Sequence, residues 1–223
     1  MSKRGRIITV VLAAILVVGV SVAIISQPRP PQPATGTGET VAFYGDSYTL
    51  GTGASDLSNR WSTVVSEQRN WNEVNPSVNG LGFINNRTEF GDGDLPSMII
   101  DANPDIVFVT MGLNDNFSYD FAAGDIKAQI TDDLQRLKTA LPEARFIVVE
   151  PFWYTEERPE SVETIIGWVK DEAEAINADY IEGASYWITG QDEFMALDGL
   201  HPNDDGYAHM ATLMNEELAG LGL

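Results

Sequence analysis

The chain has 223 residues, 43% hydrophobic and 9% aromatic, which excludes a wholly disordered protein and predicts one globular domain after the N-terminal segment. Its formal net charge of −20 repels phosphate backbones, so we expect no nucleic-acid partner. The absence of cysteine excludes disulfides and thiolate zinc sites, and the presence of only two histidines disfavours a multi-histidine metal site. Acidic runs at 91–94 and 204–205 lack the spacing of a calcium loop.

The first 26 residues are predicted to be a membrane anchor or a signal peptide. A basic flank at 3–6 precedes 19 uncharged, mostly apolar residues at 7–25, about the length that crosses a bilayer as a helix. The basic flank favours a cytoplasmic N-terminus, which would leave the body of the protein outside the cell. A small-x-small site at 21–23 makes cleavage and secretion the alternative. Both alternatives predict export.

Residues 27–40 form a predicted linker that is rich in proline, glycine and threonine. This composition blocks helix formation and favours an extended spacer. The folded domain is expected at 41–223. The chain beyond residue 27 keeps 10 basic and 33 acidic residues, a net charge of −23, which we interpret as a solvated acidic surface.

The folded domain is predicted to alternate strands with helices. Short apolar runs predict five strands, at 41–44, 71–74, 105–111, 145–150 and 178–181. Apolar residues at helical spacing predict five helices, at 60–69, 96–102, 126–141, 162–176 and 207–218. This alternation predicts an α/β fold with a parallel sheet and helices on both of its faces. In such sheets, active residues lie in loops at the carboxyl ends of the strands.

Ser47 follows the first predicted strand, and Asp198 and His201 come far downstream in Asp198-Gly199-Leu200-His201-Pro202. A serine hydroxyl is a poor nucleophile unless a base takes its proton and a third group orients that base. We therefore predict Ser47 as nucleophile, His201 as base and Asp198 as the orienting acid. A turn whose aspartate caps the local backbone is the alternative interpretation of the Asp/His pair. His209, within the last predicted helix, is interpreted as a structural or surface residue.

Asn114 lies in Gly112-Leu113-Asn114-Asp115, directly after the predicted strand at 105–111. Its side-chain amide can donate to a developing oxyanion, a contribution of about 3–4 kcal/mol per donor. A simple Asn-Asp turn is the alternative. The backbone N–H of Gly80 is a second candidate donor, with Gly82 as its rival, and the N–H of Ser47 is the third.

Together these segments resemble the SGNH hydrolases, also called the GDSL family of esterases and lipases, from about residue 41 to the end. Gly45-Asp46-Ser47 matches the serine block, with Tyr48 where many members have leucine or isoleucine. The segments at 112–115 and 198–201 match two further blocks well. Gly80 falls where the glycine block is expected, and this block is the loosest of the four.

The resemblance implies a flavodoxin-like three-layer fold, no cofactor, and hydrolysis of carboxylic esters through an acyl-serine. Short-chain, lipid and O-acetyl-carbohydrate esters are all open as substrates. We expect a monomer that contacts the membrane only through its N-terminal helix. A non-catalytic cell-surface binding or scaffold domain on the same fold is the alternative, although such a domain has no physical need for the full serine, asparagine, aspartate and histidine set.

Overall fold

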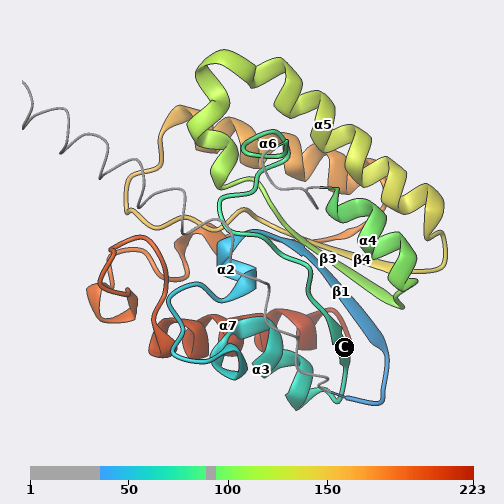
Figure 1. The fold of residues 1–223 in the computed structure, drawn as a ribbon, viewed down its shortest axis with the longest axis horizontal. Coiled ribbons are helices and arrows are strands. Elements are labelled where there is room, and N and C mark those ends of the chain that lie inside the picture. The colour runs from blue at the N-terminus through green and yellow to red at the C-terminus, as the bar shows by residue number, and fades with distance from the viewer. Residues whose placement is uncertain (1–35, 89–93) are drawn as a thin grey trace, which may run out of the picture. The chain divides into compact units, whose positions relative to one another are not determined.

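The computed structural model describes residues 36–88 and 94–223, which are drawn in colour in Figure 1. The predicted anchor or signal peptide at 1–26, most of the predicted linker, and residues 91–93 of the acidic run at 91–94 lie outside the described residues. Within the described ranges, no helix is both long enough and apolar enough to cross a membrane.

Five parallel strands form one sheet in the order β2-β1-β3-β4-β5. They are β1 (Thr40–Gly45), β2 (Asn72–Val74), β3 (Ile106–Thr110), β4 (Arg145–Val149) and β5 (Asp179–Ile181). The chain starts at β1, moves outward to β2, and then returns to the other side of β1 to build the rest of the sheet. This is the flavodoxin-like order, and its switch point lies at the carboxyl ends of β1 and β3.

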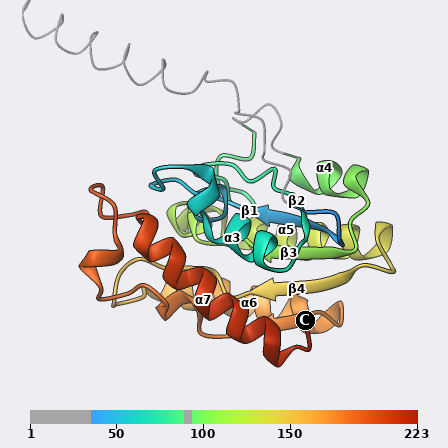
Figure 2. The ribbon, with the colours of Figure 1, turned by 90° about the horizontal axis from the view of Figure 1, so that it is seen from below.

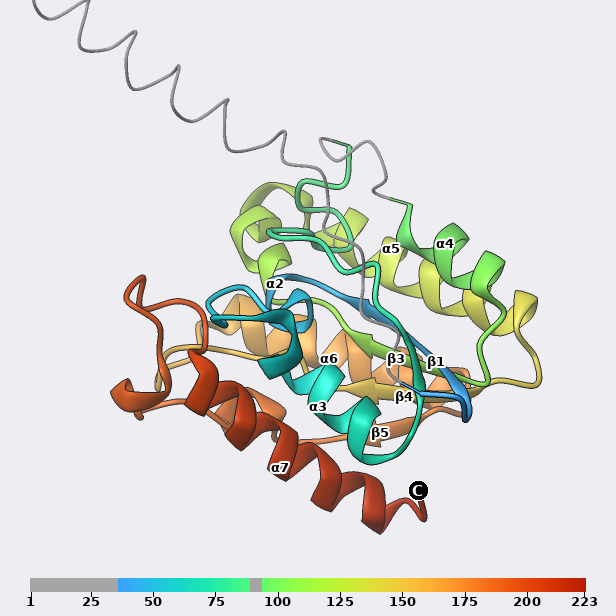
Figure 3. The ribbon, with the colours of Figure 1, turned by 60° about the horizontal axis from the view of Figure 1, so that its bottom comes forward.

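Helices cover both faces of the sheet. They are α2 (Ser47–Leu50), α3 (Trp61–Gln68), α4 (Leu95–Ala102), α5 (Tyr119–Ala140), α6 (Glu160–Ala175) and α7 (Asp204–Gly220). Short 3₁₀ turns are η1 (Leu57–Asn59), η2 (Asn114–Ser118), η3 (Ala184–Tyr186) and η4 (Asp192–Phe194). Figure 1 shows α3 and α7 side by side below the sheet and α5 and α6 above it, with α4 on the same face as α5. In Figure 2, which is seen from below, α3 and α7 lie in front of the sheet, and Figure 3 shows the same pair from an intermediate angle.

Alternate residues of each strand enter two separate cores. Val41 and Phe43 pack with α3 and α7, whereas Ala42 and Tyr44 pack with α4 and α5. Phe43 anchors the first core, with its ring centroid 5.1 Å from that of Phe108 and 5.5 Å from that of Trp61. Because both faces are covered, every residue of β3 is buried, which explains its continuous apolar run.

All ten elements expected from the sequence are present, and the parallel α/β fold is confirmed. The largest difference concerns α5, which begins at Tyr119 and not near residue 126, and which has a non-helical residue at Ala122. It ends at Ala140, two residues before Pro142, because proline cannot continue the backbone hydrogen bonding. The short helix α2 was not expected, since four residues carry no helical periodicity.

Candidate active site

Ser47 is the first residue of α2 and follows β1 after one intervening residue, Asp46, which caps the helix. The helix packs tightly on the sheet at Gly45, where an added Cβ would lie 2.5 Å from Cβ of Thr49 and 2.6 Å from Oγ1 of Thr110. Only glycine therefore permits this turn. Ser47 is 4% exposed, and its hydroxyl forms no hydrogen bond within residues 36–88 and 94–223.

Buried polar side chains hold the far end of α2. A four-residue helix leaves its carbonyls unpaired unless other groups satisfy them. The amide of Asn75 donates to the carbonyl of Thr49 at 2.8 Å, and the guanidinium of Arg60 donates to that of Leu50 at 3.2 Å. Arg60 is in turn paired with Glu73 at 3.2 Å, and both side chains are fully buried. These bonds fix the carboxyl-terminal end of α2, the helix that carries Ser47.

The carboxylate of Asp198 is hydrogen-bonded to the ring of His201, as the sequence predicts. Its Oδ2 lies 2.7 Å from Nδ1, and its Oδ1 accepts the backbone N–H groups of Leu200 at 2.9 Å and of His201 at 3.0 Å. Partial burial acts to raise the pKa of Asp198, but these hydrogen bonds outweigh it and lower the pKa to about 2. The ionised carboxylate makes Nδ1 the donor, which leaves Nε2 of His201 as an acceptor.

The loop that carries His201 packs against the segment that begins with Ser47. The hydroxyl of Tyr48 donates to the carbonyl of Leu200 at 2.5 Å, and the rings of Tyr48 and His201 lie 6.0 Å apart. A Cβ added at Gly53 would lie 3.1 Å from Cβ of His201. Among the described residues no hydrogen bond joins Ser47 to His201. Such bonds are often loose without substrate.

Asn114 is the first residue of η2, directly after the β3 edge, and is 7% exposed. Its amide nitrogen donates to the carbonyl of Leu81 at 3.1 Å and to Oδ2 of Asp46 at 3.3 Å. Asp46 is the neighbour of Ser47, so Asn114 joins the nucleophile segment to the glycine loop. Burial is the main cause that raises the pKa of Asp46 to about 7, Asp115 adds to it, and the N–H of Tyr48 opposes it.

The two candidate glycines differ in their backbone N–H groups. Gly82 donates to the carbonyl of Asn85 at 2.9 Å, whereas Gly80 donates no hydrogen bond to any residue in the described part of the chain. Gly80 has a φ of +69°, and its carbonyl accepts the side-chain amides of Asn85 at 2.9 Å and Asn86 at 3.1 Å. Of the two glycines, Gly80 is therefore the one whose backbone N–H is available to donate to an oxyanion.

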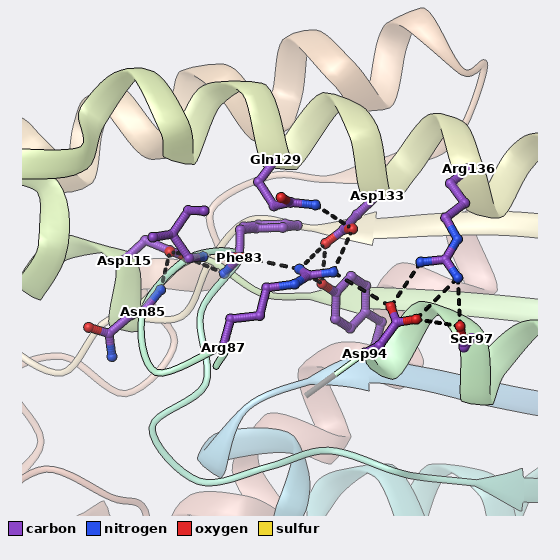
Figure 4. A network of polar contacts seen from close by, with 11 residues as sticks. Phe83, Asn85, Arg87, Asp94, Ser97, Asp115, Gln129, Asp133 and Arg136 are labelled. Carbon is purple, nitrogen blue, oxygen red and sulfur yellow. Dashed lines mark hydrogen bonds and ion pairs between the residues drawn. The ribbon is translucent and has the colours of Figure 1, made fainter. Parts of the chain in front are cut away.

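Asp115 organises the loop that follows these glycines, a role that was not predicted from the sequence. Its buried carboxylate accepts the backbone N–H groups of Phe83 and Ile84, each at 2.8 Å, and of Asn85 at 3.2 Å (Figure 4). A Cβ on Gly82 would lie 2.5 Å from this carboxylate, so the loop and Asp115 are in close contact. Its position beside Asn114 was the only signal in the sequence.

A second carboxylate, Asp133 of α5, fixes the other end of the same loop. Arg87 binds it through two nitrogens, at 2.6 and 2.9 Å, and the hydroxyl of Tyr44 donates to it at 2.5 Å (Figure 4). Asp133 is 1% exposed. The segment from Phe83 to Arg87 is therefore held by two buried carboxylates.

Two hollows border the loop that precedes His201. One, of about 560 Å³, is lined by Gly53, Asn203 and residues 195–198. The other, of about 460 Å³, is lined by Asp192, Gly199, residues 154–156 and 195–197, and Gly190. A third cavity, of about 470 Å³ around Asp105 and Arg145, contains none of the predicted site residues. In residues 36–88 and 94–223, no group of three or more acidic or histidine side chains is placed to hold a metal ion.

The arrangement of a serine, an Asp/His pair and an asparagine around one sheet edge agrees with the match to a known family. The family described as GDSL-like lipase/acylhydrolase matches residues 43–209. The chain belongs to this family. The matched range contains every residue predicted for the site, and membership supports an ester hydrolase.

Relatives of this GDSL-family chain include a curated protein named GDSL lipase Rv0518 from Mycobacterium tuberculosis, 27% identical over 99% of this chain and 100% of the relative. The esterase EstA from Pseudoalteromonas has the same fold, with a TM-score of 0.67, 18% identity, and coverage of 82% of this chain and 98% of that chain. An acetylxylan esterase from Geobacillus stearothermophilus gives a TM-score of 0.59 and 18% identity, with coverage of 83% and 96%.

Proposed function

We propose that this GDSL-family chain is an exported serine ester hydrolase that works through an acyl-serine intermediate. One observation carries the proposal: Asp198 binds Nδ1 of His201 at 2.7 Å in a loop that packs against the helix beginning at Ser47. A base with one nitrogen fixed and the other free, next to a serine, is the arrangement that nucleophilic catalysis requires. The family match supports ester hydrolysis as the reaction class.

In the first half of the reaction, Nε2 of His201 takes the proton of the Ser47 hydroxyl while Oγ forms a bond to the ester carbonyl carbon. The carbonyl electrons move onto oxygen, and the tetrahedral intermediate collapses when His201 gives its proton to the leaving alcohol. Asp198 stays ionised and stabilises the imidazolium. Water, deprotonated by His201, then attacks the acyl-serine; the bond between the acyl carbon and Oγ breaks, His201 returns the proton to Oγ, and the acid leaves.

Three donors are proposed for the oxyanion: the N–H groups of Ser47 and Gly80 and the side-chain amide of Asn114. The N–H of Gly80 has no partner among the described residues, which supports its role over that of Gly82. The amide of Asn114 donates to Asp46 and to Leu81 without substrate, at the long distances of 3.3 and 3.1 Å, so an oxyanion would compete with weak bonds.

The proposed substrates are uncharged carboxylic esters, with short-chain, lipid and O-acetyl-carbohydrate esters as the classes to compare. Among the described residues that line the two hollows next to the loop at 195–199, none is a lysine or an arginine, which disfavours an anionic ester. The Geobacillus relative is named an acetylxylan esterase and the Mycobacterium relative a lipase. A panel of esters from acetate to palmitate, with acetylated xylan, separates these classes.

Export is proposed from the basic flank and the apolar run at 7–25. Cell fractionation tests it: a retained anchor predicts full-length protein in membranes, released by protease cleavage within 27–40. Secretion after cleavage predicts a mature chain that starts near residue 24. Full-length protein in the soluble cytoplasm would overturn export without affecting the proposed catalysis.

Hydrolysis of p-nitrophenyl acetate and labelling by a fluorophosphonate test the catalytic proposal. We expect Ser47→Ala to lose nearly all activity and all labelling while its free energy of unfolding stays within about 1 kcal/mol of wild type. Ser55→Ala is the matched control, since Ser55 is an exposed serine of the same segment that binds Asp204 and not the Asp198 pair. The structure of EstA is that of an esterase inhibited by monoethylphosphonate, which supports the choice of a phosphonate probe.

The outcomes separate the enzyme from the non-catalytic alternative. A binding or scaffold domain predicts no hydrolysis and no labelling of the wild-type protein across the whole ester panel. Labelling at another serine, or full activity in Ser47→Ala, would overturn the assignment of the nucleophile even if the protein is an esterase.

A further inference from the structure

Tyr48 occupies the position after the nucleophile, where the sequence departs from the leucine or isoleucine of many family members. Its side chain is fully buried, and its hydroxyl donates to the carbonyl of Leu200 at 2.5 Å. The two residues are 152 positions apart in the sequence. This bond links the helix that begins at Ser47 to the loop that carries Asp198 and His201, and a leucine side chain has no donor that can form it.

The Leu200 carbonyl that Tyr48 binds belongs to the peptide unit that ends at the backbone N–H of His201. That N–H donates to Oδ1 of Asp198 at 3.0 Å. The peptide plane before His201 is therefore held on one side by Asp198 and on the other by Tyr48. Since Asp198 lies in the same short loop, the bond from Tyr48 is, among the hydrogen bonds of the described residues, the one that joins this peptide plane to the helix of Ser47.

The ring of Tyr48 is itself held rigidly. It stacks on Phe152, with centroids 5.8 Å apart and planes 15° from parallel, and Phe152 packs edge-on against Trp61 at 6.1 Å. The centroid of the His201 ring lies 6.0 Å from that of Tyr48. Burial, the largest cause, raises the pKa of Tyr48 well above its ordinary value, so the phenol stays protonated and keeps donating over the whole working pH range.

We propose that Tyr48 is a positioning residue for the base: its bond to Leu200 fixes the peptide plane of His201 and thereby the direction in which Nε2 faces Ser47. This inference rests on the proposed function. It assigns no proton transfer to Tyr48, whose role is to hold geometry. A displacement of about 1 Å at a reacting group lowers rates by about a hundredfold, so the loss of this bond should be visible in kcat.

The test compares Tyr48→Phe with Tyr207→Phe. Tyr207 is the matched control because it is also a fully buried tyrosine whose hydroxyl donates to a backbone carbonyl, that of Thr52, at 2.7 Å. We expect Tyr48→Phe to lower kcat on p-nitrophenyl acetate by about tenfold or more with KM unchanged, and Tyr207→Phe to change kcat by less than about twofold. Tyr48→Leu introduces the residue found in many family members, and it should lower kcat at least as much as Tyr48→Phe.

A second measurement does not depend on turnover. In the NMR spectrum, the Nδ1–H proton of His201 that bonds to Asp198 should exchange with water faster in Tyr48→Phe than in wild type, and at the wild-type rate in Tyr207→Phe. Wild-type kcat together with wild-type exchange in Tyr48→Phe would overturn the inference, as would equal losses in both variants. A wild-type protein without esterase activity would instead overturn the proposed function, and the exchange measurement would still test Tyr48.

Discussion

Oδ2 of Asp46 lies 3.3 Å from the amide nitrogen of Asn114, so the neighbour of the proposed nucleophile is hydrogen-bonded to a proposed oxyanion donor. Asp46 is 1% exposed, and burial is the main cause that raises its pKa to about 7. When it is ionised, this buried carboxylate places negative charge beside the proposed position of the oxyanion. The protonation of Asp46 therefore affects both the stability of the fold and the electrostatics of the site.

The raised pKa of Asp46 predicts a pH-dependent stability. Because the folded protein binds this proton more tightly than the unfolded chain does, the stabilisation is complete below about pH 4 and is lost as the pH rises through about 7. Relative to Asp46→Asn, the wild type should lose free energy of unfolding on the order of 4 kcal/mol between these limits. Urea unfolding of both proteins at pH 4, 5, 6, 7 and 8 measures the difference, and a constant difference would contradict the prediction.

Asn114→Ala should lower kcat by about 10²–10³ with little change in KM, because the amide is expected to act on the oxyanion and not on the bound ester. Asn114→Asp should be at least as damaging, since it adds a negative charge beside the oxyanion and next to Asp46. Steady-state kinetics of the two variants measure this. If Asn114 only supports an Asn-Asp turn, Asn114→Asp will keep near-normal kcat, and other donors must then be sought.

Asp198→Asn should lower kcat by about 10²–10⁴. The asparagine amide would donate to Nδ1 of His201 and move the ring proton to Nε2. Protonated Nε2 cannot accept the proton of Ser47. Because the Asp198 side chain is 49% exposed, the free energy of unfolding near pH 7 should change by less than about 1 kcal/mol. Asp204→Asn is the control, because Asp204 binds the exposed Ser55 and not His201. Equal kcat losses in both variants would argue against an orienting role.

The pKa of Asp198 also constrains the pH profile of the reaction. Since hydrogen bonds lower this pKa to about 2, the carboxylate stays ionised at every pH above about 4. The stability that these bonds contribute is present above about pH 4 and is lost only as the pH falls through about 2. A loss of activity between pH 4 and 7 must therefore come from a group other than Asp198, and it should persist in rates measured for Asp204→Asn.

The free energy of unfolding should respond differently to alanine at the two candidate glycines, Gly80 and Gly82. At Gly82 the new Cβ would lie 2.5 Å from the Asp115 carboxylate, which holds three backbone N–H groups, so we expect a loss of about 3 kcal/mol. At Gly80 the nearest atom is the flexible amide of Asn86, 3.2 Å away, and the cost is that of a positive φ, about 1–2 kcal/mol. Urea unfolding ranks the two variants, and a larger loss at Gly80 would contradict the close packing of Gly82 on Asp115.

The sequence predicted the elements and the sheet edge well because both depend on local patterns. Strand ends follow from apolar runs, and parallel strands bring their carboxyl ends to one edge, so Ser47 and Asn114 could be assigned to the same place. The Asp198–His201 bond follows from their three-residue spacing across Gly199. The residues 1–35 and 89–93 lie outside the described structure, so the anchor, its cleavage and most of the linker stay predictions.

The contacts that the sequence did not predict join distant residues without any periodic signal. Arg60 and Glu73 form a buried ion pair, although charged residues before a helix and in an edge strand are more often solvated. From the sequence, Asp115 has a place only in the alternative interpretation of an Asn-Asp turn, yet its carboxylate accepts three backbone N–H groups from another loop. Such pairs are set by tertiary packing, which one sequence does not encode in readable form.

The order of elements along the chain has a consequence for how this protein reaches its active form. All five strands are complete by Ile181, but His201 and α7 come later, and α7 covers the sheet face that it shares with α3. During synthesis, the five strands are therefore complete before the base and its helix have been added to the chain. The proposed ester hydrolysis should accordingly appear during synthesis only after the β-structure, because it requires His201 and the docking of α7.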